Sequence, residues 1–128
     1  MTIDELREFF KADLFAMEQG ITIDRVSENE AECSMKLKPV HRNAAGGIQG
    51  GVIFTLADFT FAVLANSKGI NTVSLGNTIQ YLSTPKGDSI RAVAETVKDG
   101  RAIISCEVRV YDKDVVVAEM ICQGFHKR

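Results

Sequence analysis

The sequence predicts a single α+β domain in which one antiparallel sheet wraps around one long, buried helix. A helical run over residues 50–67 is apolar on nearly all sides, which is typical of a buried helix. Four strand-like runs follow it, and short, turn-rich connectors join them. Short connectors favour antiparallel neighbours, because a parallel crossover needs a dozen or more residues. The 128 residues suffice for one domain with one core.

A helix over residues 2–18 is the first expected element. Apolar side chains recur there at helical spacing: Ile3, Leu6, Phe9, Phe10, Leu14 and Met17. Thr2 can serve as its N-cap, and Gly20 is a stop signal. In residues 21–38, apolar and polar residues alternate in two stretches, one on each side of residues 27–30, which predicts a hairpin. The single domain 1–128 therefore divides into an N-terminal helix at 1–19 and a core at 20–128.

The central helix and four strands complete the core. Gly50 and Gly51 begin this helix, and Gly69 ends it. The strand-like runs are NTVSLGNTIQYLS, DSIRAVAETVK, AIISCEVRVY and VVVAEMICQGF, and their connectors are TPKG, KDG and DKD. Consecutive strands of this series are expected to be antiparallel neighbours.

The composition excludes several classes of function. With a net charge of −2, the chain has no basic field to hold a nucleic acid, so any anionic ligand depends on a few placed Lys or Arg side chains. The N-terminal segment mixes charged and apolar residues, unlike a signal peptide, and no apolar run is long enough to span a bilayer. We expect a cytoplasmic protein with neither a membrane nor a nucleic-acid partner.

The cysteines predict neither a disulfide framework nor a zinc site, because they are odd in number and widely spaced: Cys33, Cys106 and Cys122. Each falls in a strand-like run, which favours buried free thiols in a reducing compartment. A catalytic cysteine would need His41 or His126 as its base, since the chain has no other histidine. We expect His41, at a strand end, to be a partly exposed loop residue. No metal site is predicted.

Asp58 stands in the middle of the apolar helix. Burial of an ionised carboxylate raises its pKa and costs stability, so such a residue needs a structural partner or a chemical role. The structural alternative is a backbone amide or an Arg that pairs with it. At about 3.6 residues per turn, Asp58 shares a face with Phe54 and two small residues, Ala62 and Ala65. Such a face can line a slot or meet another chain closely.

The glycine pair at the start of the same helix can hold a carbonyl oxygen. Gly50 and Gly51 lack Cβ atoms, and the N–H groups of a first helical turn have no acceptor within the helix. With the helix dipole behind them, these donors can stabilise an oxyanion. The alternative is an ordinary loop-to-helix turn, just as Asn43 in the preceding loop can be an ordinary Asx turn.

The central stretch contains, in order, Asn43, Gly46-Gly47, Gln49-Gly50-Gly51, Leu56-Ala57-Asp58 and Ala65-Asn66-Ser67. This arrangement resembles the hotdog-fold acyl-CoA thioesterases, above all the PaaI type named for phenylacetate catabolism. The pattern of that family is approximately N-x-x-G-x-x-H-G-G, then F-x-L-A-D on the helix, and often A-x-N-S. Weaker similarity in VSLGNTIQYLSTPKGD, VKDGR and VVVAEMICQGF extends the match to roughly residues 35–125.

The resemblance implies a hydrolase of acyl- or aryl-CoA thioesters that needs no cofactor beyond the CoA of its substrate. Asp58 would be the catalytic carboxylate, as general base on water or as nucleophile on the thioester. The Gly50 N–H would bind the thioester carbonyl, and Asn43 would lie across a dimer interface from Asp58 of the other subunit. Family members form homodimers that often double to homotetramers, with the active sites between subunits.

The same resemblance implies a set of substrate contacts. Gly51 would let the substrate approach the helix start, and Ser74 or its neighbour Thr72 would supply a hydroxyl that orients water. Cations at turns would hold the phosphates of CoA: Lys86, Lys98 and Arg101. Apolar side chains of the central helix would line the acyl slot: Phe54, Phe59, Phe61 or Leu64.

Gln49 departs from the family pattern, which commonly has His at this position. A carboxamide forms hydrogen bonds but transfers no proton, so acid–base chemistry falls on Asp58, while Gln49 can still hold the carbonyl beside the Gly50 N–H. The departure also favours an alternative, a non-catalytic acyl-CoA-binding or sensing protein, which the 128 residues disfavour because they leave no room for an output domain. A hydratase is disfavoured, because neither the helix nor the loop just before Gly50 contains a histidine.

Overall fold

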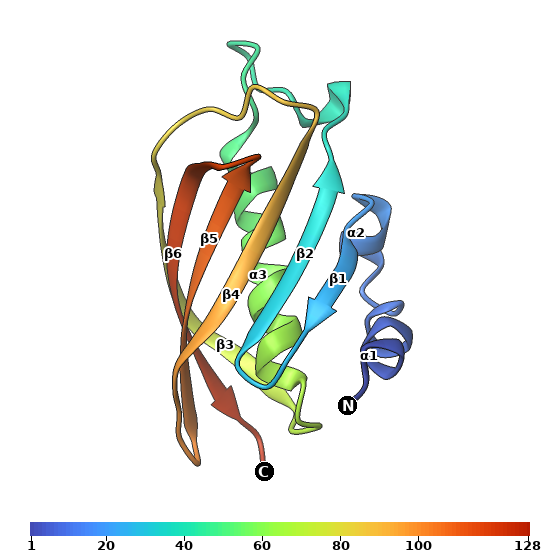
Figure 1. Cartoon of the computed structure of the whole chain (residues 1–128), viewed down its shortest axis with the longest axis vertical. Helices are drawn as coiled ribbons and strands as arrows, with labels where there is room; N and C mark the ends of the chain where they lie inside the picture. The colour runs from blue at the N-terminus through green and yellow to red at the C-terminus, as the bar shows by residue number, and fades with distance from the viewer.

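The computed structural model describes residues 1–128 and contains one antiparallel sheet that curves around one long helix (Figure 1). The elements are α1 (Ile3–Phe10), α2 (Leu14–Glu18), β1 (Thr22–Val26), β2 (Glu30–Lys36), the 3-10 turn η1 (Pro39–His41), α3 (Gly50–Asn66), β3 (Thr72–Tyr81), β4 (Ser89–Asp99), β5 (Ile103–Asp112) and β6 (Val115–His126). The six strands lie in the order β1-β2-β4-β5-β6-β3, and every pairing is antiparallel. The predicted α+β fold class is confirmed.

The core lies between α3 and the inner face of the sheet. Strands β2, β4, β5 and β6 alternate buried and exposed residues, so one face packs on the helix and the other faces solvent. Most of α3 is buried, as its apolar pattern predicted, and the buried Thr60 hydroxyl donates to the Leu56 carbonyl at 2.7 Å. Strand β3 is an edge strand with mostly exposed residues, while α1 and α2 lie beside β1 at the opposite edge (Figure 1).

The N-terminal segment forms two short helices, so the prediction of one continuous helix over 2–18 is wrong. Thr2 is the expected N-cap, in a reciprocal capping box with Glu5. Asp13 interrupts the helix, because its carboxylate accepts from the Ala16 N–H at 3.3 Å and caps α2 instead. Leu14, which fits the helical period, is consequently 74% exposed.

The β3–β4 connection is not the hairpin that its turn residues predicted. Strand β3 pairs with β6, whereas β4 pairs with β2 and β5, so residues 82–88 cross the end of the sheet. The Asp112 carboxylate holds this loop by accepting from the Lys86 and Gly87 N–H groups at 2.7 and 3.1 Å. The other expected hairpins, β1–β2, β4–β5 and β5–β6, are all present.

The cysteine and histidine side chains are buried. The three cysteines are free thiols in the core, as expected, and burial raises the pKa of each to about 12. The expectation of a partly exposed His41 is wrong, because its side chain is only 2% exposed. Its Nδ1 accepts from the Lys38 N–H and its Nε2 bonds the Gln19 Oε1, both at 3.0 Å. None of the helices combines the length and apolar character that crossing a bilayer requires.

Candidate active site

Gln49 is the N-cap of α3. Its side-chain Oε1 folds back and accepts a hydrogen bond from the Gly51 N–H. A Cβ atom on Gly51 would lie 2.7 Å from that oxygen, so any side chain at position 51 would move the Gln49 carboxamide from this position. Because the Oε1 is engaged, the Nε2 amide group is the part of Gln49 that remains free to donate to a ligand.

Gly50 presents an open hydrogen-bond donor. Its N–H makes no hydrogen bond within the chain, as the first N–H groups of a helix lack intrahelical acceptors. Its carbonyl accepts from the Tyr81 hydroxyl at 3.1 Å, and a Cβ here would lie 3.1 Å from the Tyr81 ring. Glycine at position 50 therefore allows β3 to pack its last residue on the helix start. Sequence reasoning missed Tyr81, whose only signal was an aromatic residue at a strand end.

Asn43 shapes the loop before α3. Its Oδ1 accepts from the Ala45 and Gly47 N–H groups at 3.0 and 2.9 Å, which is an Asx-type loop. Gly46 has a φ of 86°, a conformation that favours glycine. The local alternative foreseen for Asn43 is thus present in the structure, and its role opposite another subunit stays a prediction.

Asp58 lies on the side of α3 that faces β3, and no Lys or Arg forms an ion pair with it. The Asn77 Nδ2 donates to its Oδ1 at 3.3 Å. Burial raises the pKa of Asp58, hydrogen bonding by Asn77 and Ser74 lowers it, and the nearby charge of Asp13 raises it, with an upward net shift. The structural Arg considered for Asp58 is absent, and this carboxylate is tuned toward taking up a proton.

A β-bulge in β3 aims two polar side chains at Asp58. Ser74 pairs with Gly124 and Gly76 with Gln123, so Leu75 between them is an extra residue. Because a bulge shifts the alternation of faces by one residue, Ser74 before it and Asn77 after it point the same way. Asn77 was not predicted. Its Oδ1 is buried without any hydrogen-bond donor, which is costly and makes the residue unusual.

A cavity of about 210 Å³ borders Asp58. Three phenylalanines line it, Phe15, Phe54 and Phe59, together with small or polar residues: Asp13, Ala16, Thr55 and Ala62. The structure does not bring Phe61 there: this side chain is 1% exposed and packs under β6, where a Cβ on Gly124 would lie 3.0 Å from its ring. Leu64 is likewise buried in the core.

Gly50 and Asp58 do not meet within one chain. Eight residues of α-helix separate them, which at 1.5 Å per residue is about 12 Å along the axis. A thioester carbonyl held by the Gly50 N–H is therefore out of reach of Asp58 on the same helix. The two halves of the expected site lie at different points of one rigid element.

Comparison with known proteins decides the family. A family model described as the thioesterase superfamily matches residues 45–119, which include the whole of α3 and most of the sheet. The chain belongs to the thioesterase superfamily. It is accordingly a thioester hydrolase.

Curated relatives and solved structures agree with this assignment. Acyl-coenzyme A thioesterase 13 of Homo sapiens is 32% identical over 111 residues, 84% of this chain and 78% of the relative. Acyl-coenzyme A thioesterase PaaI of Escherichia coli is 31% identical over 108 residues, 84% of this chain and 74% of the relative. The structure of the E. coli PaaI protein covers 99% of this chain and 97% of its own with a TM-score of 0.86 at 21% identity, which shows the shared hotdog fold.

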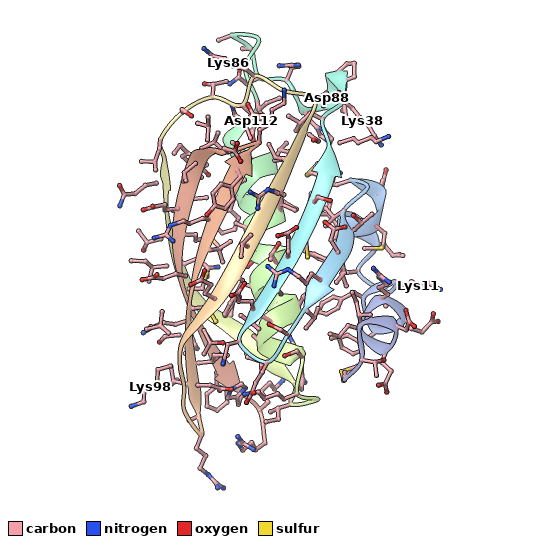
Figure 2. All side chains as sticks on the ribbon, viewed as in Figure 1. Lys11, Lys38, Lys86, Asp88, Lys98 and Asp112 are labelled. Carbon is pink, nitrogen blue, oxygen red and sulfur yellow. The ribbon has the colours of Figure 1, made fainter.

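The three cations predicted to bind CoA, Lys86, Lys98 and Arg101, are divided between opposite ends of this thioesterase. Lys86 precedes β4 and Arg101 follows it, so the length of the strand, roughly 35 Å, separates them. Figure 2 shows Lys86 at one end of the sheet and Lys98, close to Arg101 in sequence, at the other. Within one chain, cations at opposite ends cannot contact the same CoA. Lys86 is at the end where α3 starts, because Gly47, in the loop before α3, lies close to Thr84 in the loop that contains Lys86.

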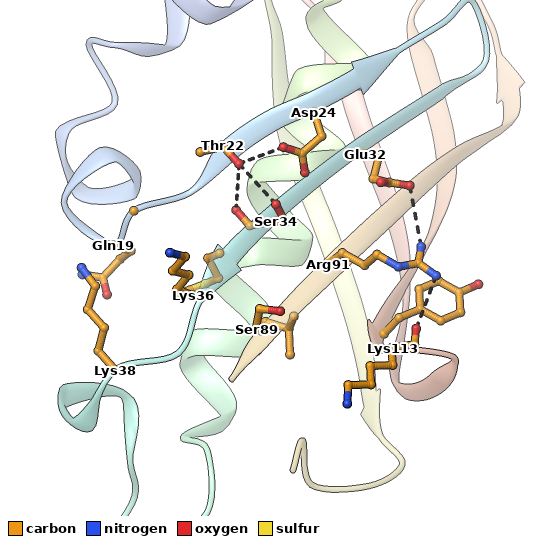
Figure 3. Close-up of a pocket in the computed structure, with 14 residues that line it drawn as sticks. Gln19, Thr22, Asp24, Glu32, Ser34, Lys36, Lys38, Ser89, Arg91 and Lys113 are labelled. Atoms are coloured by element: carbon orange, nitrogen blue, oxygen red, sulfur yellow. Dashed lines mark hydrogen bonds and ion pairs between the residues drawn. The ribbon is translucent and has the colours of Figure 1, made fainter. Parts of the chain in front are cut away.

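The largest cavity of the thioesterase, about 610 Å³, lies on the outer face of the sheet, away from α3 (Figure 3). Thr22, Ser34 and Ser89 contribute hydroxyl groups, and three lysines without a carboxylate within 4.0 Å border it: Lys36, Lys38 and Lys113. The Arg91 guanidinium is already engaged, 4.3 Å from the Tyr111 ring centre and 3.7 Å from Glu32.

Proposed function

We propose that this thioesterase hydrolyses acyl-CoA thioesters at composite sites, each built from Gly50 of one copy and Asp58 of a second copy. The separation of about 12 Å between these residues on one helix carries the proposal, because no single chain can apply both to one carbonyl. The names of two relatives, acyl-coenzyme A thioesterase 13 and acyl-coenzyme A thioesterase PaaI, support the choice of CoA thioesters.

The edge strand β3 supports assembly through its free side. It presents unpaired backbone groups and exposed apolar residues, Val73, Leu75 and Tyr81, and an open edge of this kind favours pairing with another strand. We take a homodimer as the minimal active unit and a homotetramer as the complete assembly. The three reduced, buried thiols fit a cytoplasmic location.

In the reaction, the thioester carbonyl accepts from the Gly50 N–H, and the Gln49 Nε2 donates beside it. Both donors stabilise the negative charge that develops on the oxygen. As a general base, Asp58 of the other copy removes a proton from a water that Ser74 helps to orient; the water oxygen forms the C–O bond, the C–S bond breaks, and the proton passes to the CoA thiolate. As a nucleophile, the Asp58 carboxylate forms the C–O bond itself and CoA leaves as the thiolate. Water then hydrolyses the resulting anhydride, which frees the acid, restores Asp58 and releases the proton that the thiolate takes up. The raised pKa of Asp58 makes it a stronger base than an exposed carboxylate.

The test is a thiol-release assay with short, long and aromatic acyl-CoAs. Asp58→Asn is expected to lose at least about 100-fold in turnover, as when a positioned acid–base group is removed. Gly50→Pro removes the amide hydrogen and adds a ring that the backbone accepts, because Gln49 already has the extended backbone that precedes proline and proline is favoured at the first helical position. Gly50→Ala is its matched control, since it adds the same Cβ but keeps the N–H.

Mixing the two inactive variants tests the composite site directly. In a dimer that holds one Asp58→Asn and one Gly50→Pro chain, one of the two sites is intact, so an equal mixture should recover about a quarter of wild-type activity. No recovery in purified mixed dimers would refute the shared site. Binding of every acyl-CoA without hydrolysis of any would refute the hydrolytic function in favour of a sensor.

A further inference from the structure

A second cavity lies next to the one at Asp58, along the same face of α3. It has a volume of about 250 Å³ and is lined by the helix start, including Gln49, Gly51 and Val52. Two residues line both cavities, Phe15 of α2 and Thr55 of α3. They form the wall between a cavity at the carbonyl-binding end of the helix and a cavity at its carboxylate.

Phe15 is placed there by the N-terminal segment. Asp13 caps α2, which has only five residues and contacts α3 through one side, where Ala16 is buried. The Phe15 side chain remains 63% exposed, and an exposed aromatic ring loses the stabilisation that burial would give it. The ring has no role in the core that would explain its position. Phe15 lies outside residues 45–119, the region that the family model matches.

A composite site makes the position of Phe15 decisive. An acyl group that runs from the carbonyl along the copy that supplies Gly50 enters the cavity at Gly51, and Phe15 of that copy walls it. An acyl group that runs along the copy that supplies Asp58 enters the other cavity, and Phe15 of that copy walls it as well. In either direction the same side chain limits the space, while Phe54, Phe59 and Ala62 make the cavity at Asp58 apolar.

We infer that Phe15 is the specificity-determining residue of this thioesterase and that it limits the length of an apolar acyl group. The inference rests on the proposed acyl-CoA hydrolysis. The wild-type protein accepts acyl groups that end at the ring, and removal of the ring joins the two cavities into one longer groove. Negatively charged acyl groups are poor substrates, because the cavity at Asp58 has two carboxylates in its lining, Asp13 and Asp58, and no cation.

The test compares kcat/KM for straight-chain acyl-CoAs from acetyl to palmitoyl and for phenylacetyl-CoA. Phe15→Ala is expected to raise the ratio of long-chain to short-chain kcat/KM by about 10-fold or more, since one methylene in an apolar pocket already changes specificity by 10-fold or more. Phe15→Trp should shorten the accepted chain. Leu14→Ala is the matched control: Leu14 is the preceding residue of α2, equally apolar and exposed, but it lines neither cavity.

The outcomes separate this inference from the function on which it rests. A wild-type protein that releases no thiol from any acyl-CoA defeats the proposed function. A wild-type protein that is active, with a chain-length profile that Phe15→Ala leaves unchanged, defeats the role of Phe15 alone. A change of elution volume in size exclusion with Phe15→Ala, absent with Leu14→Ala, would make Phe15 an interface residue and also overturn the inference.

Discussion

Replacement of Asn77 by leucine tests how the environment of Asp58 controls its ionisation. Leucine has nearly the same size, so the change removes only the Nδ2 donor that lies 3.3 Å from the carboxylate and the buried Oδ1 that has no donor. A hydrogen bond to a charged group contributes about 1.5–3 kcal/mol, and the length of this one places it at the low end. Since about 1.4 kcal/mol corresponds to one pKa unit, the pKa of Asp58 should rise by about one unit.

The assay is the pH dependence of kcat/KM for one good acyl-CoA substrate. The hydrogen bond from Asn77 favours the ionised form of Asp58, so its loss moves the acidic limb of the profile upward by about one pH unit. Activity at the alkaline plateau should change little, whereas activity well below the wild-type midpoint should fall about 10-fold. Thr78→Val is the matched control, because Thr78 is the next residue of β3 and its exposed side chain points to the other face.

The same variant has an expected effect on stability that runs opposite to its effect on activity. An unsatisfied buried polar atom costs about 1–3 kcal/mol, so its removal should leave the melting temperature of Asn77→Leu unchanged or raise it. An acidic limb that stays at the wild-type position, in a folded and active variant, would show that Asn77 does not act through Asp58.

Three further predictions concern the helix start and the buried groups. Gln49→Ala removes the cap of α3 and should lower the free energy of unfolding by about 1 kcal/mol in urea titrations; an unchanged midpoint would contradict the capping role. Burial lowers the pKa of His41 below its usual 6.5, so the unfolded state takes up the proton first, and stability should fall as the pH drops below 6.5; His41→Gln should abolish that slope. The three buried thiols, Cys33, Cys106 and Cys122, should resist a thiol reagent at pH 8 in the native state and react on unfolding. Fast labelling of the native protein would show that they are accessible.

The sequence predicted what periodicity and local chemistry determine. The apolar run at 50–67 became α3, and the mid-helix carboxylate at Asp58 drew attention because no local rule explains it. The neighbours of β3 were not predictable in this way. Which strand an edge strand pairs with depends on how the whole sheet closes around α3, and a loop rich in turn residues gives no information on this.

Side chains that act through tertiary contacts were also missed. Asn77 and Tyr81 sit in a strand and reach α3 only because β3 curves over the helix. A signal was present for one of them, since Gly76 and Asn77 are residue types that strands disfavour, and a glycine inside a strand often marks a bulge. Phe15 carried no comparable signal, because its exposure follows from the break of the N-terminal helix at Asp13.

The family pattern expected from the sequence has histidine where this chain has Gln49, and a glutamine there fits the proposed division of chemistry along α3. At one end, a carboxamide that caps the helix holds the Gly50 N–H in place and contributes geometry without any proton transfer. In the proposed mechanism Asp58, eight residues after Gly50, carries the acid–base chemistry alone, and burial raises its pKa while hydrogen bonding from β3 lowers it. Because both groups are fixed on one rigid helix, a two-fold axis that brings Gly50 of one copy to Asp58 of the other also brings the reverse pair together. The symmetry that completes one active site therefore completes two, and dissociation of the copies should abolish both at once.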